Sequence, residues 1–171
     1  AHPVYIRTPC IYTYTLYIYA HPVYIYFFNF LIQKIKEIES LAVDTLYNRI
    51  LYSDENYSLR YVSTLLDSND KGTIGLGKFK RDIEGIALSP PIENYKNGLI
   101  WVSDQQRQSL NLFDRKTREY LGKIKVTATE TDGIDFAELP LFMNSRGTIF
   151  MMNDKQHNFH WVFLLVYAPR S

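Results

Sequence analysis

Three acidic residues occupy the same place in a repeated pattern and are the side chains of this sequence best suited to bind a metal ion. Glu39, Glu84 and Asp132 each stand at the head of an apolar run, and Asp82 lies just before Glu84. Carboxylates brought together by neighbouring repeats would repel one another. Ca²⁺ relieves such repulsion, because it accepts about six to eight oxygen ligands in flexible geometry. The pattern therefore predicts a calcium site assembled from several repeats.

A second motif adds ligands near the same strand ends. Ser-Asp-Glu at 53–55 and Ser-Asp-Gln at 103–105 contribute Glu55 and Gln105. A structural hypothesis competes throughout, since an acidic residue beside a strand often only caps a turn. That turn-forming role is favoured for three aspartates spaced fifty residues apart, namely Asp54, Asp104 and Asp154. His157 and His160 lack partners at metal-ligand spacing, so surface or packing roles are predicted for them.

The residues that must position these groups form a repeat of about fifty residues. The first and second copies align at 38–43 with 83–88, 50–55 with 100–105 and 58–62 with 109–113. A weaker third copy runs through 131–134, 149–154 and 158–162. Periods of this length are typical of solenoids, propellers and other arrays.

Each repeat has the pattern of short strands separated by turns. The clearest copy predicts strands at 83–88, 99–103, 109–113 and 120–126, bounded by turn residues such as Asn97-Gly98. Four antiparallel strands in such a repeat make a propeller blade. The predicted fold is all-β, a partial β-propeller of two to three four-stranded antiparallel blades, with a β-solenoid as the alternative. A closed ring needs about four to eight blades, so missing blades or another chain would complete it.

Residues 1–33 differ from the rest of the chain. No Asp, Glu, Lys or Arg occurs from 8 to 33, and His-Pro-Val-Tyr-Ile occurs at 2–6 and again at 21–25. Three interpretations stand: a translated simple nucleotide repeat that is not native protein, a membrane or export segment, and a native β-hairpin. The predicted domains are this Tyr/Ile-rich segment, poorly packed against the repeats, and a propeller domain at 34–171.

Charge and cysteine content limit the partners and crosslinks expected of the chain. The net charge is +1, so no basic excess points to nucleic acid. Cys10 is the single cysteine, which rules out an internal disulfide. No membrane association is expected for 34–171.

The ordered motifs resemble successive C-terminal blades of calcium-dependent β-propeller phytases, over about residues 35–165. The motifs that carry the resemblance lie at 39–44, 52–57, 77–80, 82–86, 102–105, 130–135 and 158–162. The resemblance implies a six-bladed, secreted enzyme that hydrolyses phosphate monoesters of inositol hexakisphosphate with Ca²⁺ at the channel mouth. It implies catalytic roles for Glu39, Glu84 and Asp132. It implies calcium binding, direct or through water, by Glu39, Glu55, Asp82, Glu84, Gln105, Asp132 and Asp135.

Two departures from the family qualify that expectation. Some members carry two acidic turns where this chain has the single Thr-Asp-Gly turn at 131–133. The family's phosphate-binding lysines and arginines come largely from earlier blades, so a truncated fragment of weak or no activity is expected. Two alternatives have no phytase activity: a non-catalytic propeller or interaction module, and another metal-dependent propeller hydrolase such as a lactonase-like enzyme.

Overall fold

The computed structural model describes residues 38–54, 58–65, 68–80, 82–92, 94–138 and 145–165. The predictions about residues 1–33 and about Glu55 lie outside these residues. Among the described residues, no helix has the length and apolar character needed to cross a membrane.

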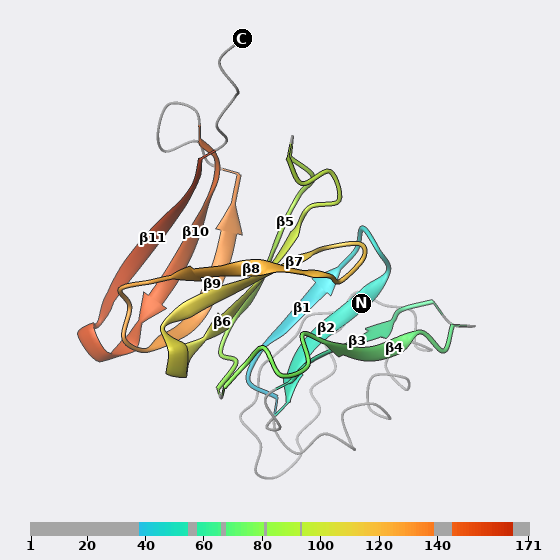
Figure 1. Ribbon diagram of the computed structural model, residues 1–171, viewed down its shortest axis with the longest axis horizontal. Helices are drawn as coiled ribbons and strands as arrows, with labels where there is room; N and C mark the ends of the chain where they lie inside the picture. The colour runs from blue at the N-terminus through green and yellow to red at the C-terminus, as the bar shows by residue number, and fades with distance from the viewer. Residues whose placement is uncertain are drawn as a thin grey trace, which may run out of the picture. The chain divides into compact units, whose positions relative to one another are not determined.

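The described residues form eleven strands in three antiparallel sheets, two with four strands and one with three (Figure 1). Sheet 1 consists of β1 (Leu41–Asp44), β2 (Arg49–Asp54), β3 (Ser58–Ser63) and β4 (Lys71–Ile74). Sheet 2 consists of β5 (Ile86–Ser89), β6 (Leu99–Asp104), β7 (Ser109–Asp114) and β8 (Tyr120–Lys125). Sheet 3 consists of β9 (Thr131–Ala137), β10 (Ser145–Asn153) and β11 (Asn158–Leu165).

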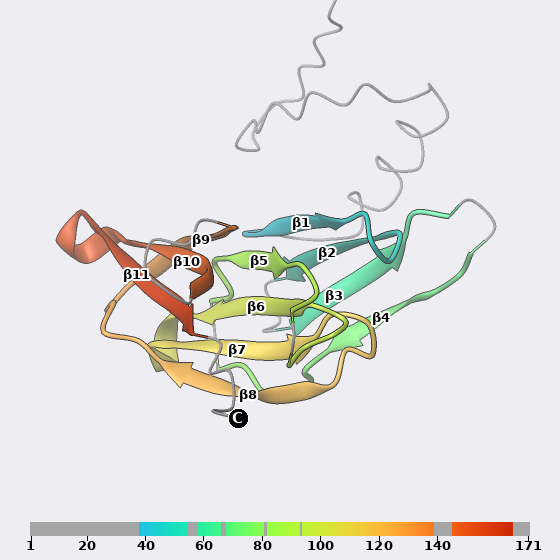
Figure 2. The ribbon, with the colours of Figure 1, turned by 90° about the horizontal axis from the view of Figure 1, so that it is seen from above.

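Each sheet pairs its strands in chain order, and successive sheets pack face to face. The innermost strands adjoin, since β5 contacts both β1 and β9 (Figure 2). This arrangement is a partial β-propeller, in which each sheet is one blade. The predicted fold class is confirmed. The described residues form no closed ring, and their only helices are the short 3₁₀ turns η1 (Gln105–Arg107) and η2 (Asp154–Gln156).

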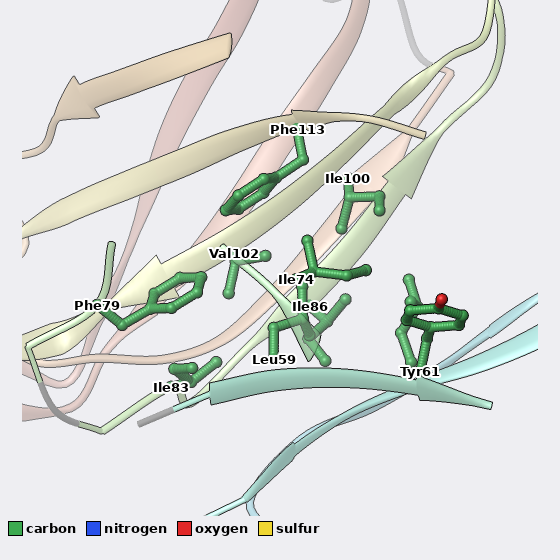
Figure 3. Packing of buried hydrophobic residues seen from close by; sticks show 10 residues of the cluster. Leu59, Tyr61, Ile74, Phe79, Ile83, Ile86, Ile100, Val102 and Phe113 are labelled. Atoms are coloured by element: carbon green, nitrogen blue, oxygen red, sulfur yellow. The ribbon is translucent and has the colours of Figure 1, made fainter. Parts of the chain in front are cut away.

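The first core cluster fills the space between sheets 1 and 2 (Figure 3). Leu59 and Ile74 from sheet 1 meet Ile86, Ile100 and Val102 from sheet 2. Fully burying such a side chain contributes about 1.5–3 kcal/mol. The alternating residues of each strand point to opposite faces, so Ile100 and Val102 reach sheet 1 while their neighbours reach sheet 3.

The second core cluster joins sheets 2 and 3. Trp101 and Leu110 of sheet 2 pack with Ile149 and Met151 of sheet 3. Every residue of β6 is buried, because a sheet lies on each of its faces. The unbroken apolar run at the start of β6, Leu99 to Val102, is thus typical of a strand that is covered on both faces.

A buried ion cluster also fastens sheet 1 to sheet 2. The Asp44 carboxylate, with no exposed surface, lies between the guanidinium groups of Arg49 and Arg115. Arg115 also donates to the Ser89 carbonyl at 2.9 Å, and Arg49 donates to the Arg115 carbonyl. Tyr47 adds a hydroxyl bond to the Asn97 carbonyl at 3.1 Å. The cluster of Asp44, Arg49 and Arg115 is called the clasp, and it was not predicted from the sequence.

Candidate functional site

The heads of the three innermost strands lie in one row. The Ser40 hydroxyl, just before β1, donates to the Ile83 carbonyl, just before β5, at 3.3 Å. A Cβ added at Gly85 would lie 2.7 Å from the Ile134 nitrogen and 3.0 Å from the Asp132 carbonyl oxygen of β9. Glycine is therefore the residue that allows this close approach. The row of strand heads, with the turns η1 and η2 beside it, is called the rim.

The row carries the three predicted catalytic residues. Glu39 is exposed and lies two residues before β1, while Glu84 is half-buried and lies two residues before β5. Asp132 is the second residue of β9 and is half-buried. The backbone neighbours described above thus bring segments far apart in the sequence to one end of the blades. Their roles in catalysis stay predictions.

Asp132 is the predicted ligand with the clearest electrostatic environment. Burial raises the pKa of the Asp132 carboxyl, and the nearby charges of Asp154 and Glu130 raise it further. The Gln105 side chain opposes this shift by donating from Nε2 to Asp132 Oδ1 at 3.2 Å. The structure therefore brings two predicted ligands, Gln105 and Asp132, together across sheets 2 and 3.

Asp82 and Asp135 have local hydrogen-bonding roles. Asp82 adopts a left-handed conformation with φ 54°, and its carboxylate accepts a bond from Gln106 Nε2 at 2.9 Å. Its carbonyl accepts a bond from the Gln105 nitrogen at 3.3 Å. The exposed Asp135 accepts a bond from the Phe136 nitrogen at 2.8 Å. Asp82 thereby fixes the head of β5 to η1.

Of the predicted calcium ligands, Gln105 and Asp132 are in contact in the described part of the chain. No group of three or more His, Cys, Asp and Glu side chains there is arranged to hold a metal ion. The predicted ligand Glu55 is outside the described residues. Calcium binding therefore stays a prediction drawn from the sequence.

The third repeat has a different register from the one that the spaced aspartates indicated. Asp104 ends β6 at the N-cap position of η1, whereas Asn153 ends β10 at the N-cap position of η2. Asn153 is thus the equivalent of Asp104, and Asp154 is the equivalent of Gln105. The fifty-residue spacing of Asp154 was misleading because this repeat is one residue shorter at that point. Asp154 instead adds a carboxylate to the rim near Asp132.

Asp104 has the structural role predicted for it. Its side chain has no exposed surface, and Oδ2 accepts a bond from the Lys80 nitrogen at 3.2 Å and lies 3.8 Å from Arg107 Nε. Burial raises the pKa of the Asp104 carboxyl, while the Lys80 bond and the Arg107 charge lower it. In sheet 3, Asn153 Oδ1 accepts the matching bond from the Glu130 nitrogen at 3.4 Å.

The comparison of sheets 2 and 3 also shows which residue of sheet 2 is equivalent to His160. The His160 ring is hydrogen-bonded to Asn153 Nδ2 at 3.2 Å and to the Thr127 hydroxyl at 2.9 Å, so the side chain has a structural role in sheet 3. The register of the turns makes Asn111 its equivalent in sheet 2. There, Asp104 Oδ1, Ser109 Oγ and Asn111 Nδ2 are buried without a hydrogen-bond partner. His157 is on the surface, with its side chain 88% exposed.

The comparisons with known proteins add little beyond this geometry. No protein-family model matches the chain, and no curated protein matches it. Solved structures of similar shape include the following two. "Structure of U3-55K" has a TM-score of 0.47 and 12% sequence identity, and the match covers 76% of this chain and 39% of that structure's chain. "Crystal structure of RRP9 WD40 repeats" has a TM-score of 0.48 and 13% identity, and covers 75% of this chain and 38% of its own.

The chain thus spans about two fifths of the length of either solved structure. The class of protein is defined by the blades themselves, as an all-β partial propeller. The finer assignment to the phytase family stays a prediction.

Proposed function

We propose that these blades are part of a β-propeller that acts as a binding scaffold for another protein, with the rim as its contact surface. The observation that carries the proposal is the row of strand heads from three successive blades, joined through Ser40 and Ile83 and through Gly85 and Ile134. Such a row offers side chains from several blades to one partner. Repeat proteins commonly bind their partners through extended surfaces to which several repeats contribute.

The rim's charge indicates the chemistry of that partner. The turns of the rim contribute two cations, Arg107 and Lys155. Acidic side chains outnumber them along the rim, namely Glu39, Asp82, Glu84, Glu130, Asp132 and Asp154. Burial raises the pKa of Asp132, and the charges of Asp154 and Glu130 raise it further; an approaching cationic group relieves this repulsion. A basic segment of a partner protein therefore fits the rim, and affinity should rise with pH as Asp132 ionises.

Site-specific crosslinking tests the proposal. A photoreactive benzoylphenylalanine replaces the exposed Gln106 on the rim, and the exposed Lys116, in the turn at the other end of sheet 2, serves as the matched control. The protein captured at 106 is identified, purified and titrated against the full chain. We expect capture at 106 and not at 116, and binding weakened by Glu84→Gln with Asp132→Asn. Equal capture at both positions, or no binding between the purified proteins, would contradict the proposal.

A second candidate is the calcium-dependent hydrolysis of phosphate monoesters of inositol hexakisphosphate. The sequence resemblance favours it, as does the placement of the segments that carry Glu39, Glu84 and Asp132 at one end of the blades. Its test is phosphate release measured over a range of Ca²⁺ concentrations. Release that depends on Ca²⁺ and falls in Glu84→Gln would select the hydrolase over the scaffold. Because weak or no activity is expected of the chain alone, the same assay is run on the chain completed with the upstream blades of a phytase. Absence of Ca²⁺-dependent release from that completed ring would favour the scaffold.

A further inference from the structure

We propose that the outer edge of β8 binds an extended acidic segment of another protein as an added strand. β8 is the last strand of sheet 2, and no strand among the described residues pairs with its outer side. An edge strand presents backbone N–H and C=O groups that can pair with another chain. Strand addition of this kind is a common mode of peptide recognition.

The backbone geometry shows which groups face outward. The Val126 nitrogen, just after β8, donates to the Gln108 carbonyl on the β7 side at 2.9 Å. Antiparallel strands turn alternate residues toward each neighbour. Lys123 and Lys125 therefore turn their N–H and C=O groups away from β7. The register shift opposite Leu112 and Phe113 confines the regular edge to the residues after Leu121.

Five cationic residues lie beside this edge and are called the basic patch: Lys78, Lys80, Arg107, Lys123 and Lys125. Arg107 donates to the Lys78 carbonyl, and Lys125 Nζ donates to the Arg107 carbonyl at 3.5 Å. Lys78 Nζ lies 4.5 Å from the centroid of the Tyr120 ring, at the start of β8. Cations of β8, of η1 and of the connection between β4 and β5 are thus gathered near one strand.

Asp104 is a carboxylate near the patch, and its burial keeps its charge off the protein surface. Asp104, which attracts Lys123 and Arg107, has no exposed surface and accepts the Lys80 backbone N–H. The lysines of the patch are exposed, so their field extends into solvent. A negatively charged partner is the one that this field attracts.

The remaining features of the edge favour a peptide over a nucleic acid. Leu121 and Ile124 are 43% and 36% exposed beside the lysines. Alternating apolar and acidic residues on an added strand would cover such side chains and pair with Lys123 and Lys125. Lysines on an edge strand discourage pairing with other strands, because their charge is costly to bury. An acidic strand is attracted instead, since its carboxylates pair with the lysines. Arg107 of η1 belongs to both the rim and the basic patch, but Lys123 and Lys125 lie on β8 outside the rim. A test on these two lysines therefore stands or falls separately from the proposed function.

A fluorescence anisotropy titration tests the proposal with the full chain. The probe is a labelled peptide that alternates glutamate and valine. We expect binding that weakens about tenfold or more in the double variant Lys123→Glu, Lys125→Glu. The matched control is Lys71→Glu with Lys116→Glu, which makes the same charge change on exposed lysines elsewhere and should alter affinity by less than about twofold.

Amide hydrogen exchange followed by NMR gives a second measurement on the same complex. Strand addition should slow exchange at Lys123 and Lys125, whose N–H groups face outward. The proposal is overturned by absence of binding, by equal weakening in the two double variants, or by binding that leaves these two amides unprotected. Tighter binding of an oligothymidylate that displaces the peptide would also overturn it, in favour of a nucleic acid.

Discussion

Arg115, in the turn after β7, binds Asp44 at the end of β1, with Nη2 2.8 Å from Oδ1. The two residues are 71 positions apart and belong to different blades. Their contact is buried, and Arg49 occupies the second carboxylate oxygen at 2.9 Å. A buried charge set of this kind is costly to disrupt, because the remaining charges lose their partner. Its position makes it a fastening between the first two blades.

Asp44→Asn should therefore destabilise the protein strongly. The substitution keeps the shape of the side chain but leaves two buried guanidinium groups without a counter-charge, which should lower the free energy of unfolding by about 3–5 kcal/mol. Urea denaturation measures the change. The matched control is Glu130→Gln, which removes a carboxylate 3.9 Å from Lys155 in an exposed pair and should cost less than about 1 kcal/mol. Similar losses in both variants would show that the clasp adds nothing.

Asp104→Asn should change how stability depends on pH. Burial raises the pKa of Asp104 in the folded protein, so the folded state holds this proton more firmly than the unfolded state does. Stability from this group therefore falls as the pH rises from its ordinary value of about 3.9 through the raised folded value. The difference in unfolding free energy between the variant and the parent should grow in favour of the variant over that range. A difference that is independent of pH would contradict the raised pKa.

Asn111→His should give Asp104 a hydrogen-bond partner like the one that His160 gives Asn153 in sheet 3. The equivalent His160 bonds to Asn153, whereas Asp104 Oδ1 and Asn111 Nδ2 are buried without a partner in sheet 2. A hydrogen bond from the new ring to Asp104 should raise the free energy of unfolding by about 0.5–1.5 kcal/mol. Thermal and urea denaturation measure the change. Asn111→Ala is the control, and a histidine variant less stable than the alanine variant would contradict this prediction.

Gly85→Ala should disturb the contact between β5 and β9. The added methyl group would lie 2.7 Å from the Ile134 backbone nitrogen, which can move only with its strand. Overpacking of this kind costs about 1–3 kcal/mol. Gly133→Ala is the matched control, since a Cβ there meets nothing within 4 Å. Equal effects of the two substitutions on urea denaturation would mean that the strands are farther apart.

Local pattern was sufficient to predict the blades. The strands predicted at 99–103 and 109–113 correspond to β6 and β7, because turn residues and apolar runs act over short distances. The predicted strand at 83–88 was displaced, since β5 begins at Ile86 after an extended segment that binds η1 through Asp82.

The site was harder to predict because its geometry depends on contacts between blades. The clasp of Asp44 and Arg115 has no local signature, and each residue alone resembles an ordinary turn residue. Equal spacing placed Asp154 with Asp104, although the turn geometry pairs Asp104 with Asn153. Position in a repeat indicates which residues share a rim, but it does not establish which oxygens converge on a ligand.

The most direct test of the account is a nuclear Overhauser measurement between Gly85 and Ile134 in labelled protein. The close approach at Gly85 predicts a strong effect between a Gly85 Hα and the Ile134 amide proton, which belong to different blades. Effects across Trp101 and Leu112, which are paired within sheet 2, serve as the internal control. Observing both would establish the row of strand heads on which the rim depends. Observing the effect within sheet 2 without the one between Gly85 and Ile134 would contradict the account.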